Sequence, residues 1–141
     1  MASALYNAGK KILQQNEWVA GDFRCLLVNA SYTPDIDAHD DVGDIVANEL
    51  SGPGYTRKTL ANKTSTVDNT NDRLDLAADN VTWTAINAGT AAYAVIYLEG
   101  ASDAARKLVG YIDFTDQVTN GGDFTLKWNG GTSSGVLFRL T

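Results

Sequence analysis

The sequence predicts an all-β fold, and two features of the chain lead to this prediction. Short runs rich in β-branched and aromatic residues recur, and Gly, Asn, Asp or Pro turns separate them at intervals of about 8–15 residues. No helical pattern long enough to connect parallel strands lies between these runs. We therefore expect one antiparallel β-sandwich domain over residues 1–141, jelly-roll-like or immunoglobulin-like, with one or two short helices.

The first 50 residues predict two short helices on either side of a strand. Leu5, Ala8 and Ile12 recur at helical spacing, which indicates an amphipathic helix over residues 4–15. Residues 22–32 predict a strand, and its continuous apolar middle indicates burial on both faces. A second helix is expected over residues 40–50, where Asp40 and Asp41 would accept hydrogen bonds from the free N–H groups of its first turn.

The remaining 91 residues predict strands and turns. Residues 68–72 form a turn cluster between two expected strands, and residues 91–98 form a near-continuous apolar run that is expected to be the central strand. Period-two alternation is clearest near the C-terminus. The other expected strands cover residues 64–67, 73–77, 81–85, 107–114, 124–128 and 136–140.

Composition and charge exclude several classes of partner. Hydrophobic residues make up 44% of the chain and charged residues 20%, as in ordinary globular domains. The net charge of −6 and the scattered basic residues argue against nucleic acid and anionic membranes as partners. The N-terminus lacks the apolar core of a signal peptide, and Cys25 is the only cysteine, which favours an intracellular origin.

A search for chemistry finds no catalytic, cofactor or metal site. Cys25 lies in an apolar run and His39 in an acidic segment, so a nucleophile–base pair is not expected, and the protein is interpreted as a non-enzyme. Asp35, Asp37 and His39 alternate as in a calcium loop, but Asp40 and Val46 stand where that loop needs Gly and Glu. We interpret this segment as a solvated acidic turn, with an irregular cation site as the alternative.

Most aromatic residues fall in phase with aliphatic residues on the expected strands. Trp83, Phe124, Trp128 and Phe138 are therefore expected in the core. Tyr93 and Tyr97 share one face of the central run, and we expect their hydroxyl groups to reach solvent or a partner.

Two segments are candidates for a partner interface. Residues 1–20 form a candidate docking segment, because Leu5, Tyr6, Ile12, Leu13 and Trp18 have no obvious place in a sandwich core. The loop over residues 51–57 is the second candidate, with Pro53, Tyr55 and Arg57 as its contact residues. If the first candidate is right, a chain lacking residues 1–15 folds but no longer assembles.

Several short motifs occur in an order that covers most of the chain. They are ALYNAGK at 4–10, YTPD at 32–35, HDD at 39–41, SGPGYT at 51–56, LANK at 60–63, DNVTW at 79–83, YAVIY at 93–97 and GYIDF at 110–114. In this order the chain resembles a family of small structural proteins of tailed phages.

The resemblance implies a virion protein, made in the host cytoplasm, that decorates or cements the capsid exterior. Its expected partners are the major capsid protein or other virion proteins, and the chain itself as a homo-oligomer. The family brings no catalytic residues to carry over. A carbohydrate- or receptor-binding module on a tail or head fibre is the alternative, and it would predict exposed aromatic side chains in a groove.

Overall fold

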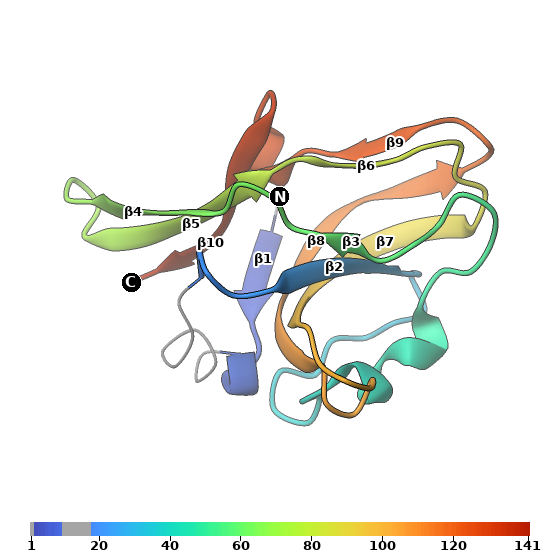
Figure 1. Ribbon diagram of the computed structural model, residues 1–141, viewed down its shortest axis with the longest axis horizontal. Coiled ribbons are helices and arrows are strands. Elements are labelled where there is room, and N and C mark those ends of the chain that lie inside the picture. The colour runs from blue at the N-terminus through green and yellow to red at the C-terminus, as the bar shows by residue number, and fades with distance from the viewer. Residues whose placement is uncertain (1, 10–17) are drawn as a thin grey trace.

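A computed structural model describes residues 2–9 and 18–141, and its largest element is a five-stranded antiparallel sheet (Figure 1). In spatial order its strands are β1 (Ala2–Leu5), β8 (Lys107–Thr119), β7 (Gly89–Leu98), β2 (Phe23–Val28) and β3 (Lys58–Thr59). The predicted central strand is confirmed, because β7 lies in the middle of this sheet.

Two smaller antiparallel sheets complete the fold. The first contains β10 (Ser134–Leu140), β5 (Arg73–Asp79) and β4 (Thr64–Asp68), and the second pairs β6 (Val81–Trp83) with β9 (Phe124–Leu126). The predicted turn at residues 68–72 between two strands is confirmed, and the structure shows that these strands, β4 and β5, pair as a hairpin. The all-β prediction is confirmed, and the sheets are consistent with a sandwich.

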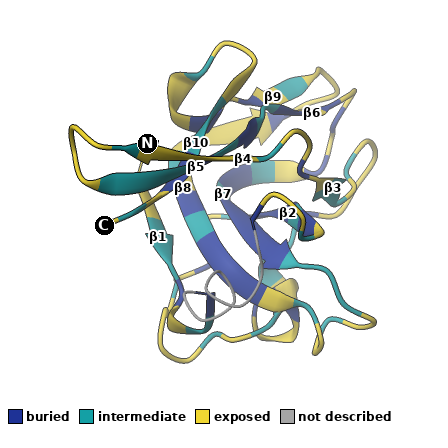
Figure 2. Cartoon of the chain, turned by 60° about the vertical axis from the view of Figure 1, so that its left-hand side comes forward, coloured by how far each residue is buried: buried dark blue, intermediate teal, exposed yellow. Residues whose placement is uncertain are grey.

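Both faces of the five-stranded sheet are covered, so β2 and β7 are buried on two sides. Cys25 and Leu27 belong to a large cluster that includes residues of the two smaller sheets. Leu26 and Val28 belong to a second cluster on the other face, which loop residues such as Ile45 cover. In Figure 2 much of β7 and the first half of β8 are dark blue, and the predicted two-sided burial of the strand around Cys25 is confirmed.

Two tryptophans anchor the large cluster through their ring N–H groups. The indole of Trp83 donates to the carbonyl oxygen of Thr56 at 2.8 Å, and that of Trp128 donates to Asp79 at 2.7 Å. Both side chains are fully buried, so each finds the hydrogen-bond partner that a buried indole needs. The core interpretation is confirmed for Trp83, Trp128 and Phe138, while Phe124 is half-buried and stacks on Trp83.

The predicted helix over residues 40–50 is wrong. Two 3-10 helices stand there instead, η1 (Val42–Asp44) and η2 (Val46–Asn48). The carboxylate of Asp44 turns back to accept the N–H groups of Asp40 and Asp41, and Leu50 donates its N–H to Leu27 in β2. Acidic side chains that bond the local backbone compete with a continuous α-helix, and pairing with β2 draws the end of the segment away.

The N-terminal helix is also different from its prediction. Ala2–Leu5 forms β1 and pairs with β8, residues 7–9 are helical, and residues 10–17 lie outside the described part of the chain. A short isolated helix is only marginally stable in water. Pairing with β8 instead gives the backbone of residues 2–5 hydrogen-bond partners on a neighbouring strand. Within the described ranges, no helix has the length and apolar character needed to cross a membrane.

Three details of the strand predictions need correction. Trp128 begins a third 3-10 helix, η3 (Trp128–Gly130), and does not continue β9. A register shift between Val136 and Phe138 interrupts the expected alternation in β10, so that Leu137 and Phe138 are both buried. Tyr97 is only 1% exposed and belongs to the second cluster, so its side chain does not reach solvent.

Candidate interaction surface

The N-terminal candidate interface is mostly part of the protein's own core. Tyr6 is fully buried, and its hydroxyl lies 2.6 Å from the hydroxyl of Tyr32. Burial is the largest cause that raises the pKa of Tyr6, which keeps it neutral. Leu5 lies in β1 and packs against the large cluster. The expectation that these side chains lack a place in the sandwich is therefore wrong for Tyr6.

Trp18 is buried as well, on the other side of the five-stranded sheet. Its indole N–H donates to the carbonyl oxygen of Ala77 at 3.1 Å, and its ring centroid lies 4.9 Å from that of Phe23. Tyr6 and Trp18 thus belong to different clusters and form no common surface. Ile12 and Leu13, the other predicted contact residues of this segment, lie outside the described residues.

The second candidate, the loop over residues 51–57, closes the edge of β2. β3 pairs only with Arg24 and Cys25, so the backbone of β2 needs other partners beyond that point. The hydroxyl of Tyr55 accepts the N–H of Leu27 at 3.1 Å and donates to the carboxylate of Glu49 at 2.6 Å. Tyr55 is therefore committed to an internal contact and is not free to bind a partner.

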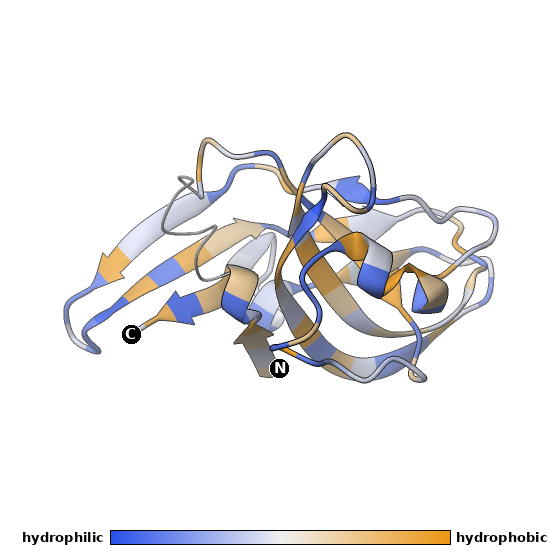
Figure 3. Cartoon of the chain, turned by 90° about the horizontal axis from the view of Figure 1, so that it is seen from below, coloured by the Kyte–Doolittle hydropathy of each residue, from blue (hydrophilic) through white to orange (hydrophobic). Residues whose placement is uncertain are grey.

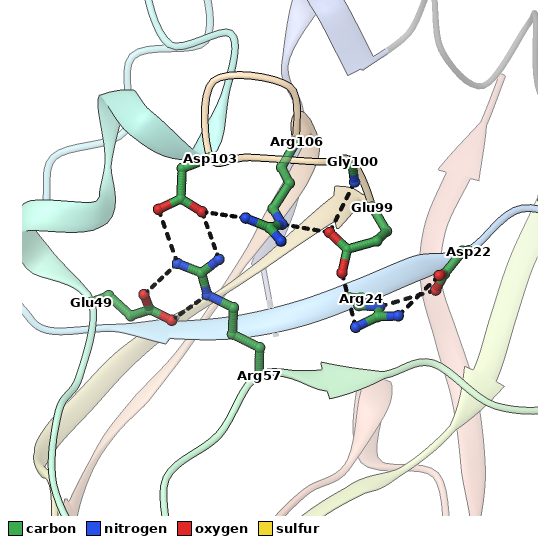
Figure 4. A network of polar contacts seen from close by, with 8 residues as sticks. All are labelled: Asp22, Arg24, Glu49, Arg57, Glu99, Gly100, Asp103 and Arg106. Atoms are coloured by element: carbon green, nitrogen blue, oxygen red, sulfur yellow. Dashed lines mark hydrogen bonds and ion pairs between the residues drawn. The ribbon is translucent and has the colours of Figure 1, made fainter.

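Arg57 holds the same loop through a chain of ion pairs (Figure 4). Its guanidinium contacts Glu49 through two hydrogen bonds, at 2.8 and 2.9 Å, and Asp103 at 2.8 Å. Asp103 also accepts from Arg106 at 2.9 Å. The paired geometry of Arg57 is the strong form of the arginine–carboxylate contact.

The chain of ion pairs continues from Arg106 to the start of β2. Arg106 pairs with Glu99, which pairs with Arg24 at 2.8 Å, and Arg24 pairs with Asp22 at 3.0 Å (Figure 4). Hydrogen bonds from Arg57 are the largest cause that lowers the pKa of Asp103. The pKa values of Glu99 and Asp22 are lowered as well, with hydrogen bonds and ion pairs favouring the charged carboxylates, which suits a structural role and does not suit a general acid.

Three loops meet at one end of the molecule, and we call this surface, residues 52–54, 85–88 and 120–123, the three-loop end. The N–H of Asn87 donates to the carbonyl oxygen of Pro53 at 2.7 Å, and Ile86 exchanges hydrogen bonds with residues 121 and 122. Gly54 has φ +76°, and a Cβ there would lie 2.4 Å from the carbonyl oxygen of Ala85. Close backbone contact therefore makes this end rigid.

Most residues of the three-loop end are exposed, apart from the buried Ile86 and Ala88, and the surface is nearly uncharged. Pro53 is exposed there, and the one charged side chain of the surface is Asp123, whose carboxylate accepts the N–H of Ala85 at 2.8 Å. Of the predicted contact residues that the structure describes, Pro53 is the one whose side chain is free for a partner. The neighbouring loops could not be assigned to this surface from sequence, because their contacts are all long-range.

The acidic segment and the lone cysteine lie in separate environments. Cys25 is fully buried in the large cluster, and burial raises the pKa of its thiol. His39 stacks on Tyr32, which belongs to the opposite cluster, with Nδ1 3.1 Å from the Tyr32 hydroxyl. The two side chains therefore face opposite sides of the five-stranded sheet and form no dyad. In the described residues, no group of three or more His, Cys, Asp or Glu side chains is placed to hold a metal ion.

A further surface was not anticipated from the sequence. The β4–β5 hairpin, which we call the arm, projects from the body of the molecule in all three overall views (Figures 1, 2 and 3). Val67 on β4 is 65% exposed, although it lies directly across from Leu74. The one sequence signal was the run Thr64–Asp68, which is polar on both faces except for its valine.

Comparisons with known proteins find no relative for this chain. No model of a protein family, no curated protein and no solved structure matches it.

Proposed function

We propose that this protein is a non-enzymatic structural protein of a tailed-phage particle that decorates or cements the capsid by binding the major capsid protein. The phage assignment rests on the ordered sequence motifs described above. The binding role rests on one structural observation, the rigid and nearly uncharged three-loop end.

Such a surface suits protein recognition for two physical reasons. Interface cores are depleted of charged residues, and the three-loop end is nearly free of them on a chain of net charge −6. A loop that is already rigid loses little conformational entropy on binding, so more of the contact energy appears as affinity. On a capsid, where one subunit can contact several neighbours, repeated contacts of this kind would raise the overall affinity through multivalency.

The rest of the charged surface supports a role as a spacer. The ion-pair chain from Glu49 to Asp22 ties the loops beside β2 and β7 to one another, which stiffens the body under load. An acidic protein is repelled by packaged DNA, which favours a position outside the shell.

The first test is co-sedimentation of the purified protein with phage heads that lack it, followed by electron microscopy. The proposal expects saturable binding with regularly spaced density on the shell. Binding only at the tail would contradict capsid decoration and indicate a fibre or adaptor protein. Binding to glycans without binding to particles would instead favour the carbohydrate-binding alternative.

A pair of matched variants tests the surface. Thr84 and Thr132 are both exposed residues outside the strands, but only Thr84 adjoins the three-loop end. Thr84→Arg should weaken head binding at least tenfold, because it places a desolvated charge beside the contact, whereas Thr132→Arg should leave it unchanged. Equal effects of the two variants would refute the assignment of this surface.

A further inference from the structure

The sheet edges of this protein differ in how open they are to an additional strand. β1, β3, β6 and β9 have four residues or fewer, and β10 is interrupted by its register shift. β4 has five residues in unbroken register with β5, and four of the five are exposed. Natural edge strands are usually protected by proline, a bulge or a central charge, and β4 carries none of these between Thr64 and Val67.

The hydrogen bonds around β5 establish which backbone groups of β4 point outward. The N–H of Asp79 donates to Ala61, on the β4 side, and the N–H of Asn80 donates to Ser133, on the β10 side. Because these directions alternate along a strand, the odd-numbered residues of β5 bond β4. They lie across from Thr64, Thr66 and Asp68. The N–H and C=O groups of Ser65 and Val67 therefore point away from the sheet.

We propose that β4 pairs antiparallel with β4 of a second copy of this chain. A two-fold axis through Thr66 places Ser65 of each copy across from Val67 of the other. Each copy presents two N–H groups and two carbonyl groups, those of Ser65 and Val67, to the other copy. All of these groups then find partners, which gives four interchain hydrogen bonds in total. The two three-stranded sheets become one six-stranded sheet.

The side chains of β4 match one another in this register. Thr66 lies across from Thr66 and Thr64 lies across from Asp68, so that hydroxyl groups meet hydroxyl and carboxylate groups. No like charges are opposed. On a chain of net charge −6, the uncharged stretch Thr64 to Val67 is a place where two copies can approach without local repulsion.

The exposed valine also gains a partner. Leu140, Leu74 and Val67 are cross-strand neighbours, and they form an apolar row that runs to the edge of the sheet. In the paired arrangement, Val67 of one copy lies diagonally beside Val67 of the other, within contact range for side chains on one face of a sheet. The row then continues across the two-fold axis and covers a side chain that is 65% exposed in the single chain.

This inference does not depend on the phage assignment, because it uses only the arm. The arm projects from the body, so β4 of another copy can reach it (Figures 1 and 2). The polar face of the arm is held internally by Arg73, which pairs with Asp68 at 3.3 Å and Asp75 at 3.0 Å.

Sedimentation equilibrium of the full chain from about 1 µM to about 1 mM tests the proposal. We expect a monomer–dimer equilibrium. Val67→Lys should raise the dimer dissociation constant at least tenfold, because each dimer then carries two like charges side by side. Val118→Lys is the matched control, since Val118 is 66% exposed on β8, and it should leave the constant unchanged.

A second variant separates pairing through the backbone from contact through side chains. Ser65→Pro removes an outward N–H and retains the hydrogen bonds to β5, so it should also abolish the dimer while the chain stays folded by circular dichroism. A wild-type chain that remains monomeric over the whole range would overturn the proposal. So would a dimer that Val67→Lys and Val118→Lys weaken equally.

Discussion

The hydroxyl group of Tyr55 gives the sharpest stability prediction, because it serves two partners at once. It accepts the N–H of Leu27, where β3 no longer covers β2, and it donates to the carboxylate of Glu49. Tyr55→Phe removes both hydrogen bonds and leaves the ring in place. A lost hydrogen bond to a charged group costs about 1.5–3 kcal/mol, and an unpaired buried N–H costs about 1–3 kcal/mol.

The two costs do not add fully, because water can reach part of a half-buried loop. We therefore expect Tyr55→Phe to lower the free energy of unfolding by about 2–4 kcal/mol, measured by urea denaturation with an unchanged m-value. Tyr111→Phe is the control, since Tyr111 is also half-buried and its hydroxyl makes no hydrogen bond within the described residues. It should change stability by less than about 0.5 kcal/mol.

A result below about 1 kcal/mol for Tyr55→Phe would refute the reasoning. It would mean that water replaces Tyr55 at the edge of β2, and that the loop over residues 51–57 does not close that edge.

Three further predictions concern the chain of ion pairs around Arg57, the three-loop end and the N-terminus. Asp103 has a lower pKa in the folded chain than the unfolded value of about 3.9, so its stabilising contribution is present above that pH and is lost as pH falls through the folded value. Asp103→Asn should therefore destabilise the protein at pH 7, and urea denaturation should find a smaller difference from wild type in acid. Gly54→Ala should destabilise by more than 1 kcal/mol in urea, because its φ is positive and its Cβ would meet a carbonyl oxygen; Gly122→Ala, with nothing within 4 Å, should cost less. Deleting residues 1–15 should abolish cooperative thermal unfolding, because it removes β1 and the buried Tyr6; a stably folded truncated chain would restore the docking-segment hypothesis.

The strands were predictable because their signals are local. The apolar run that became β7 and the turn cluster between β4 and β5 are contained in a few consecutive residues, so period and turn chemistry suffice. The helix predicted over residues 40–50 is absent although its apolar spacing was right, because a nearby carboxylate competes for its first backbone groups and a distant strand binds its last residue. Asp44 bonds the preceding turn, and Leu50 bonds β2.

The candidate interface was harder to predict for the same reason. Whether an apolar side chain such as Tyr6 or Trp18 serves the core or a partner depends on what the rest of the chain places over it. Tyr55 and Arg57 were predicted as contact residues for a partner, but the structure gives them internal partners, Leu27 and Asp103, which lie 28 and 46 residues away. Sequence spacing cannot reveal contacts of this range.

Composition, charge pattern and period-two alternation determined that this is an acidic all-β protein with a buried cysteine and with Trp83 and Trp128 in its core. These properties follow from the local preferences of each residue type and from the need to bury apolar surface. Only the tertiary structure decided that the N-terminal aromatic residues belong to the core, that three distant loops form one rigid end, and that β4 is left as an open edge. Each of these depends on which strands become neighbours, and strand pairing is set by the whole chain at once.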